Sequence, residues 1–294
     1  MANAPEFARF AAIDWSGAKG KRHRGIAIAL AGAGAGPPAL VRPGHVWSRS
    51  EVLDWLIAAA AEAPTLFGFD FSFAPPIAER GDYLPGEANV PRDAKGFWAY
   101  VDAKSGDEDL GAASFLERAH RRHFYFGAAD GAKRDFLHHR ACELAFNAGG
   151  GGKASTVYDA IGAAQVAKAS FSGMRLLHRL DGRVPIWPFD FAQDRPFDPL
   201  PTQGSLVVEI YTRAFIRLAG QSGRKVRTAA ALDVALAGLG SKPARLGHDP
   251  SDHESDVLIA AAGLRAVACQ PRYWSPAGMT PALARSEGWT FGIA

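Results

Sequence analysis

The feature that most constrains this 294-residue sequence is a set of three apolar segments, far apart in the chain, that each carry one acid. The acids are Asp14 in Arg-Phe-Ala-Ala-Ile-Asp, Asp70 in Thr-Leu-Phe-Gly-Phe-Asp and Glu209 in Leu-Val-Val-Glu-Ile-Tyr. Continuous apolar runs of this length predict strands that are buried on both faces of a sheet. An ionised carboxylate there costs free energy unless a cation lies beside it. The pattern therefore predicts an α/β protein with acids at the ends of neighbouring strands.

The first seventy residues predict the order β-β-β-α-β. A second apolar run, 24–30, is expected to pair antiparallel with the strand that ends at Asp14, and a third short strand is expected within 39–47. A helix that is capped by Ser48 or Ser50 follows, and it ends at Pro64. Further elements are expected as a helix over 156–180 that is broken near 170–173, a short strand over 184–187, a loop over 188–203, a helix from Thr212, a helix over 225–239, an apolar helix over 253–268 and a last strand over 287–292.

Residues 76–152 differ in character from the rest and predict a helical insertion within a single domain that spans residues 1–294. Cations and aromatic side chains alternate in it, as in proteins that bind a nucleic-acid strand. A solvated helix face over a small aromatic core would give the same pattern. The cations are Arg118, Arg121, Arg122, Lys133, Arg134 and Arg140, and the aromatic residues are Phe124, Tyr125, Phe126 and Phe136. The histidines of the insertion are expected to be core or surface residues rather than metal ligands: His120, His123, His138 and His139.

Composition sets few limits on partners. The formal net charge of +3 permits a polyanionic partner but does not require one. Cys142 and Cys269 lie far apart with no CxxC motif, which indicates free thiols in a reducing cytoplasm. Residues 1–12 have no apolar core of a signal peptide, and the longest Ala-rich run, 57–61, is too short to span a bilayer. We therefore expect a cytoplasmic protein without a membrane partner; the oligomeric state is not indicated.

The start of the last apolar helix adds further acids to the three on the strands. His253 and Asp256 are three residues apart and share a helical face, and Asp256 heads the core-facing run. Asp252 is expected to cap the helix and Glu254 to face solvent. Carboxylate oxygens that gather in this way suit Mg²⁺ or Mn²⁺. Two such ions about 3.5–4 Å apart can activate water for phosphodiester hydrolysis.

The order of these motifs resembles the ribonuclease H-like fold, with a mixed sheet flanked by helices. Within it the chain is similar to RuvC-type nucleases and to a microbial family, domain of unknown function 429, whose members are described as predicted nucleases. The resemblance rests on Ile13-Asp14 with its Gly turn, Gly68-Phe69-Asp70, Val208-Glu209-Ile210-Tyr211, the segment 253–260 and the closing Glu-Gly-Trp-Thr-Phe-Gly. One departure is Thr212, which stands where that family usually has proline.

The resemblance implies a divalent-metal-dependent nuclease that acts on DNA or RNA. Asp14 would bridge two ions, while Asp70 and Asp256 would each complete one. His253 would orient or deprotonate the attacking water. Glu209 would be a further ligand or support one.

The resemblance implies that His253 or Asp252 supplements these ligands. Cations of the first hairpin could neutralise a phosphate near the metal or be ordinary hairpin charges: Lys19, Lys21, Arg22 and Arg24. Two other functions fit the same fold. One is an actin-like or sugar-kinase-type ATP-binding phosphotransferase, since Asp14 precedes a Gly-containing turn. The other is a protein that binds nucleic acid or a partner without catalysis.

Overall fold

The computed structural model describes residues 6–161, 165–191 and 204–294. Within these ranges, five strands form one mixed sheet in the order β3-β2-β1-β4-β5. The strands are β1 (Arg9–Asp14), β2 (Ala27–Gly32), β3 (Ala39–Leu40), β4 (Thr65–Asp70) and β5 (Leu206–Glu209). β1 pairs antiparallel with β2 and parallel with β4, which pairs parallel with β5. The carboxyl ends of β1, β4 and β5 therefore meet at one edge of the sheet, and the expected β-β-β-α-β order is confirmed.

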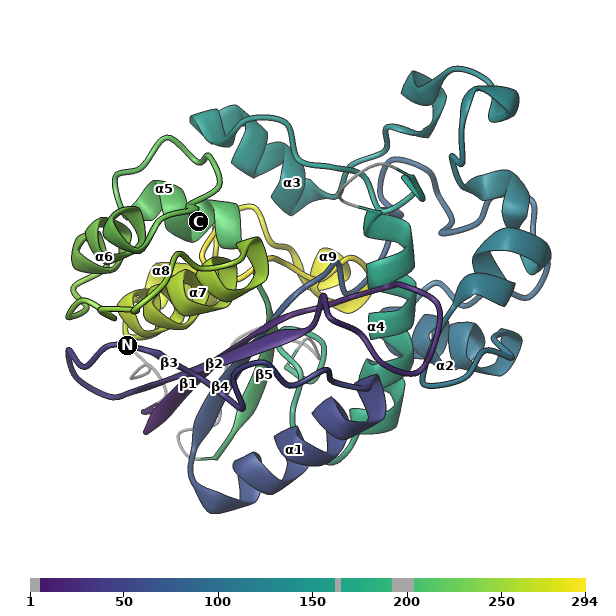
Figure 1. Ribbon diagram of the computed structural model, residues 1–294. Helices are drawn as coiled ribbons and strands as arrows, with labels where there is room; N and C mark the ends of the chain where they lie inside the picture. Colours follow the sequence, from purple (N-terminus) through teal and green to yellow (C-terminus); the bar gives the residue numbers. More distant parts are fainter. Residues whose placement is uncertain (1–5, 162–164, 192–203) are drawn as a thin grey trace.

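Helices cover both faces of this sheet (Figure 1). The α-helices are α1 (Arg49–Glu62), α2 (Ala94–Lys104), α3 (Ala141–Phe146), α4 (Val166–Leu180), α5 (Thr212–Leu218), α6 (Ala229–Gly238), α7 (Asp252–Ala268), α8 (Pro271–Trp274) and α9 (Pro281–Ser286). Shorter helical turns are η1 (Phe115–Ala119), η2 (Arg121–His123), η3 (Ala128–Asp130), η4 (Lys133–Phe136) and η5 (Asn147–Gly151). α1 lies under one face and α7 over the other. Among the described helices, each is too short or too polar to cross a membrane.

Alternation along the strands divides the apolar residues into two cores. Ala11 and Ile13 of β1 pack into a core with α1, α2 and α4, whereas Phe10 and Ala12 pack into a second core with α5, α6 and α7. Successive strand residues point to opposite faces of a sheet. Asp14 therefore continues the face of Phe10 and Ala12, which is the face that α7 covers.

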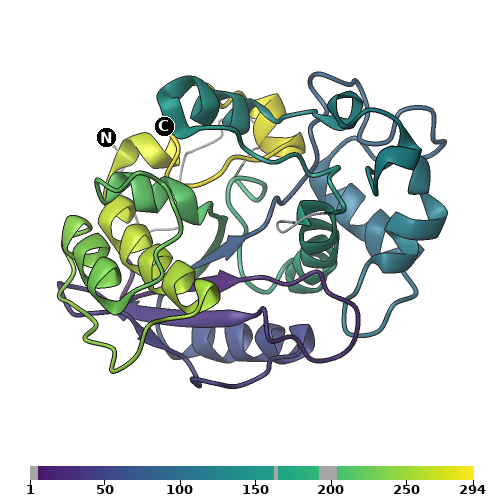
Figure 2. The same ribbon diagram turned by 45° about the horizontal axis from the view of Figure 1, so that its top comes forward.

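Most of the segment 76–152 packs beside α4, at the side of the molecule away from α7 (Figure 2), whereas its end, with α3 and η5, lies nearer to α5. Phe97, Phe115 and Phe124 of this segment share one core with Ile13 and Phe69 of the sheet. The expected helical insertion is helical only in pieces, and residues 137–140 separate η4 from α3.

Two predicted elements are wrong. α4 begins at Val166 and runs unbroken through Gly173. A Cβ on Gly173 would lie 2.3 Å from a ring carbon of Phe71, so this glycine allows close packing on the sheet rather than a break. The tail over 287–292 forms turns instead of a strand, although Phe291 N still donates to Glu209 O at 2.8 Å.

Other boundaries shift without changing the order. α6 begins at Ala229, so Lys225 precedes the helix that was predicted to contain it. The expected strand over 184–187 is reduced to an isolated bridge between Ile186 and Val207. Most of the loop predicted over 188–203 lies outside the described residues.

Candidate metal centre

Asp14 and Asp70 end adjacent parallel strands and are register partners. Asp70 follows Leu66 and Gly68 on its strand face, and that face is covered by α7: a Cβ on Gly68 would lie 2.8 Å from Leu264 Cδ1. Both carboxylates therefore project from the same edge and the same face of the sheet. Their side chains are intermediate in burial, as expected where a buried strand ends.

α7 brings two further groups to this edge. Its N-cap is Ser251, which forms a capping box with Glu254, so Glu254 has a local structural role rather than simply facing solvent. His253 Nδ1 lies 2.6 Å from Asp14 Oδ2. Asp256, one turn later, is buried; its Oδ2 accepts from Lys225 Nζ, while its Oδ1 is buried with no hydrogen-bond partner among the described residues. A buried carboxylate oxygen without a hydrogen-bond partner is available to bind a cation.

These groups line one cleft of about 510 Å³ at the carboxyl edge of the sheet. Its walls include Asp14, Asp70, Asp256, His253 and Lys225. The cleft thus joins two aspartates, Asp14 and Asp256, that are 242 positions apart in the chain, since 256 − 14 = 242. This convergence is the arrangement that the spacing of the strand acids predicts.

The electrostatics of the cleft favour a bound cation. Burial, followed by the charge of Asp14, raises the pKa of Asp70 to about 7. Burial also raises the pKa of Asp256, although Lys225 opposes this shift. The hydrogen bond from His253 to Asp14 raises the pKa of the imidazole. Each of these pKa shifts favours the protonated form of the group, so a bound proton offsets negative charge in the cleft. A metal ion would offset the same charge in place of the protons.

Glu209 has a different set of partners from the predicted ones. It follows Val207 on the strand face that packs toward α1 and α4, opposite to the face of Asp70. Its two oxygens accept from Arg140 Nη1 and Nη2, from Phe73 N at 2.7 Å and from Thr290 Oγ1 at 2.6 Å. A carboxylate has about four lone-pair positions, and these four donors fill them. Glu209 and Arg140 both line the cleft, but the carboxylate of Glu209 is occupied by Arg140 and the other donors in this arrangement.

Asp252, in contrast, is not among the residues that line the cleft. Its carboxylate accepts from Arg227 Nε at 3.1 Å, and 38% of its side chain is exposed. It occupies the first helical position of α7 rather than the cap. Arg227 holds it at the surface, and the helix dipole stabilises a negative charge in the first turn of a helix.

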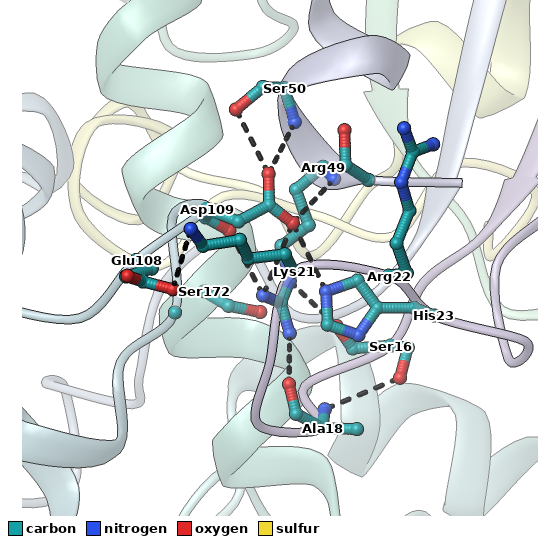
Figure 3. A network of polar contacts seen from close by, with 12 residues as sticks. Ser16, Ala18, Lys21, Arg22, His23, Arg49, Ser50, Glu108, Asp109 and Ser172 are labelled. Carbon is teal, nitrogen blue, oxygen red and sulfur yellow. Dashed lines mark hydrogen bonds and ion pairs between the residues drawn. The ribbon is translucent and has the colours of Figure 1, made fainter. Parts of the chain in front are cut away.

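The loop after Asp14 is held by a network of buried polar groups (Figure 3). Arg49 donates to Ser16 O at 2.9 Å, to Ala18 O at 2.7 Å and to Asp109 O at 3.0 Å. The Asp109 carboxylate accepts from Arg49 N at 2.9 Å and lies 3.1 Å from His23 Nε2. The network joins the first hairpin, the start of α1 and the insertion, and it fixes the chain that follows the first acid.

Most cations that the sequence singled out are paired with acids. In the first hairpin, Lys19 pairs with Glu117 at 2.7 Å, and Lys21 with Glu108 at 3.4 Å, while Arg22 contacts Glu51. In the insertion, the pairs are Arg121 with Asp130 at 2.7 Å, Arg122 with Glu87 at 2.8 Å, Lys133 with Asp159 at 2.6 Å and Arg134 with Asp135 at 3.7 Å. These pairs favour the solvated-face interpretation over a basic binding surface.

Sequence reasoning missed two residues near the acids, Lys225 in the wall of the cleft and Thr212 beside Asp70. Lys225 was assigned to a helix, and Thr212 only to a helix start. Thr212 does begin α5, and its hydroxyl donates to Asp70 Oδ2 at 2.8 Å. Its position directly after the β5 segment was the available signal, because a residue there meets the ends of the neighbouring parallel strands.

The carboxylate oxygens of the three aspartates lie farther apart than the ligands of a single ion would. Among the described residues, the group of three His, Cys, Asp or Glu ligand atoms that lie within 4.8 Å of one another is Glu87, His120 and His123, in the insertion. A wider spread is expected of ligands that are divided between two ions about 3.5–4 Å apart.

Comparisons with known proteins add no identification. No protein-family model, curated protein or solved structure matches this chain. The inference about function therefore depends on the residues of the cleft and on their geometry.

Proposed function

We propose that this protein is a divalent-metal-dependent hydrolase of nucleic-acid phosphodiester bonds, built on a ribonuclease H-like sheet. The observation that carries the proposal is the convergence of Asp14, Asp70 and Asp256 on one cleft, together with the unpartnered Oδ1 of Asp256. The strand order, with β1, β4 and β5 parallel and β2 antiparallel, is compatible with that fold.

The donor set suits Mg²⁺ or Mn²⁺. Asp14, Asp70 and Asp256 supply hard carboxylate oxygens, and a pair of these ions would activate water and stabilise the leaving oxygen. Asp14 lies between the other groups, as register partner of Asp70 and hydrogen-bond partner of His253, so it is the acid we assign to both ions.

His253 is suited to moving a proton. Asp14 accepts from Nδ1, which leaves Nε2 as the ring atom that exchanges protons with water. Half of the side chain, 49%, is exposed, so water reaches it. The hydrogen bond to Asp14 raises the pKa of His253, which favours the protonated imidazole, the form that donates a proton in general acid catalysis.

Support for a polyanionic substrate comes from a hollow that adjoins the cleft. This hollow, of about 340 Å³, is lined by Arg24 and Arg42 as well as by Glu254, and it shares His253 with the cleft. A phosphate backbone that passes from the hollow to the cleft would meet these two arginines.

The experiment is cleavage of single- and double-stranded DNA and RNA in Mg²⁺ or Mn²⁺. We expect the wild-type chain to cleave at least one of these substrates, and Asp14→Asn to lose at least 10²-fold in rate while it keeps its thermal melting temperature. Asp252→Asn is the matched control and should keep its rate. Equal rates in wild type and Asp14→Asn would reject the proposal. Binding of nucleic acid and Mn²⁺ without cleavage would also reject it, in favour of a non-catalytic binding protein.

A further inference from the structure

A second cluster of potential ligands lies in the insertion, apart from the carboxylate cleft. Glu87 comes from the chain between β4 and α2, His120 lies between the turns η1 and η2, and His123 is the last residue of η2. Glu87 Oε1 lies 3.0 Å from His123 Nε2 and 3.7 Å from His120 Nδ1. The side chains of both histidines are only 6% exposed, and that of Glu87 is 23% exposed. Three ligand atoms from two chain segments thus point to one position.

The orientation of His120 is an independent sign of a ligand. Its Nε2 lies 3.1 Å from Tyr100 Oη, whereas its Nδ1 is buried and has no hydrogen-bond partner among the described residues. A proton on Nε2 that is donated to Tyr100 leaves the lone pair of Nδ1 directed at Glu87 and His123. Histidines that bind metals are commonly oriented by a hydrogen bond from the other ring nitrogen.

We propose that Glu87, His120 and His123 bind a zinc ion. Zn²⁺ takes imidazole nitrogens at about 2.0–2.1 Å and carboxylate oxygens at about 2.0–2.2 Å, so neighbouring ligand atoms of a tetrahedral site lie about 3.3 Å apart. The two measured separations from Glu87 Oε1, 3.0 Å and 3.7 Å, bracket this value. Burial lowers the pKa of both imidazoles, which agrees with the neutral form that a metal requires.

Arg122 is the competitor for this site. Its Nη2 lies 2.8 Å from Glu87 Oε1, and its Nε lies 2.9 Å from the same oxygen. Its side chain is 62% exposed, so the guanidinium can turn to solvent when a cation takes its place. Two cations on one carboxylate oxygen repel each other. An ordinary Glu–Arg–His network would be weakened by loss of Arg122, but a zinc site would be improved by it.

A bound zinc ion would connect the loop that contains Glu87 to the turns that contain both histidines. The segment that contains the histidines packs against Tyr100 of α2 and, through Phe115, against Phe171 of α4 rather than at the carboxyl edge of the sheet. Three protein ligands leave a fourth position for water. The proposal is independent of the carboxylate centre and of its proposed function.

The test is calorimetric titration of the full chain with ZnCl₂ after chelator dialysis, in a double variant, Asp14→Asn with Asp70→Asn, that removes the other centre. We expect one equivalent to bind in this background, with an affinity at least 100-fold weaker after Glu87→Gln or His120→Ala. Arg122→Ala should tighten binding about fivefold. His138→Ala is the matched control, since His138 faces Glu79 at 3.4 Å in the same insertion and should have no effect.

Two readouts guard against misfolding of a variant. Zinc should raise the melting temperature of the control but not that of Glu87→Gln, and Co²⁺ in place of zinc should give the absorption of a tetrahedral site only where all three ligands remain. Absence of stoichiometric zinc binding would overturn the proposal. Binding that survives Glu87→Gln and His120→Ala, or that weakens in Arg122→Ala, would overturn it as well.

Discussion

Lys225 neutralises the acid of α7 that would otherwise remain unpaired in the cleft. Its ammonium pairs with Asp256 Oδ2, and Asp256 together with Asp14 raises the pKa of Lys225 even though burial opposes the shift. The metal-free protein therefore already holds one positive charge where the account places metal ions. This makes Lys225 the residue whose replacement separates a metal centre from a simple ion pair.

Lys225→Met should increase the affinity for Mn²⁺ about fivefold, because removing a neighbouring cation is worth about 1 kcal/mol at a partly solvated site. Titration of free Mn²⁺ by electron paramagnetic resonance measures this change. Arg227→Met is the matched control on the same loop and should change the affinity by less than twofold. An equal increase in Mn²⁺ affinity in Arg227→Met would indicate that Asp252 is also a metal ligand. Weaker Mn²⁺ binding in Lys225→Met would contradict the proposed metal centre.

Asp70 predicts a pH dependence of metal binding. Since the pKa of Asp70 is about 7 in the folded protein, a metal must displace a proton from it below that pH. We expect the Mn²⁺ affinity to fall about tenfold per pH unit between pH 7 and pH 5, and to level off above pH 8. Folding stability in the metal-free protein should change in the opposite direction. Its free energy of unfolding should fall as the pH rises from about 4 to 7, because Asp70 ionises at a lower pH in the unfolded chain than in the folded protein.

Thr212→Val should shift the pH dependence of Mn²⁺ affinity to higher pH, because it removes a hydrogen bond that favours the charged form of Asp70. Thr290→Val is the control, since Thr290 donates to Glu209 rather than to Asp70. The same titrations at several pH values measure both. A profile that is unchanged in Thr212→Val would show that Asp70 is not the group that competes with the metal.

At the scale of elements, the strands and the long helices were predictable and the insertion was not. Continuous apolar runs identify β1 and β4, and a capped apolar run identifies α7, since tertiary contacts agree there with local preference. Alternation of side chains along the strands distinguishes Glu209 from Asp70: each of these acids ends an apolar run, but the register places them on opposite faces. Sequence alone does not give that register. Gly173 was misread because its role is set by Phe71, 102 residues away, since 173 − 71 = 102.

The contact between α3 and β5 depends on the buried pair of Arg140 and Glu209. Arg140→Met should destabilise the fold by about 3–5 kcal/mol, because it leaves a buried carboxylate without its partner. Adding Glu209→Gln should recover part of this loss. Urea unfolding measures both, with the exposed Arg134→Met as a control that changes stability little. Full stability of Arg140→Met would contradict the structural role assigned to Glu209.

At the scale of the whole molecule, one edge of the sheet is where distant parts of the chain meet. β1 and β4 end there with acids, α7 covers it from one face, and the loop after Asp14 is fixed by α1 and the insertion through Arg49 and Asp109. The two cores on either side of the sheet hold these elements in place. The site is thus a product of the topology. The central claim is that divalent cations bind at this edge of the sheet.

Anomalous diffraction from a crystal soaked in Mn²⁺ tests that claim most directly. The account predicts two peaks about 3.5–4 Å apart in the cleft, both within ligand distance of Asp14, with Asp70 at one and Asp256 at the other, and with Glu209 still bound to Arg140. A cleft without an anomalous peak at Mn²⁺ concentrations that support binding in solution, or peaks that contact none of the three aspartates, would contradict it.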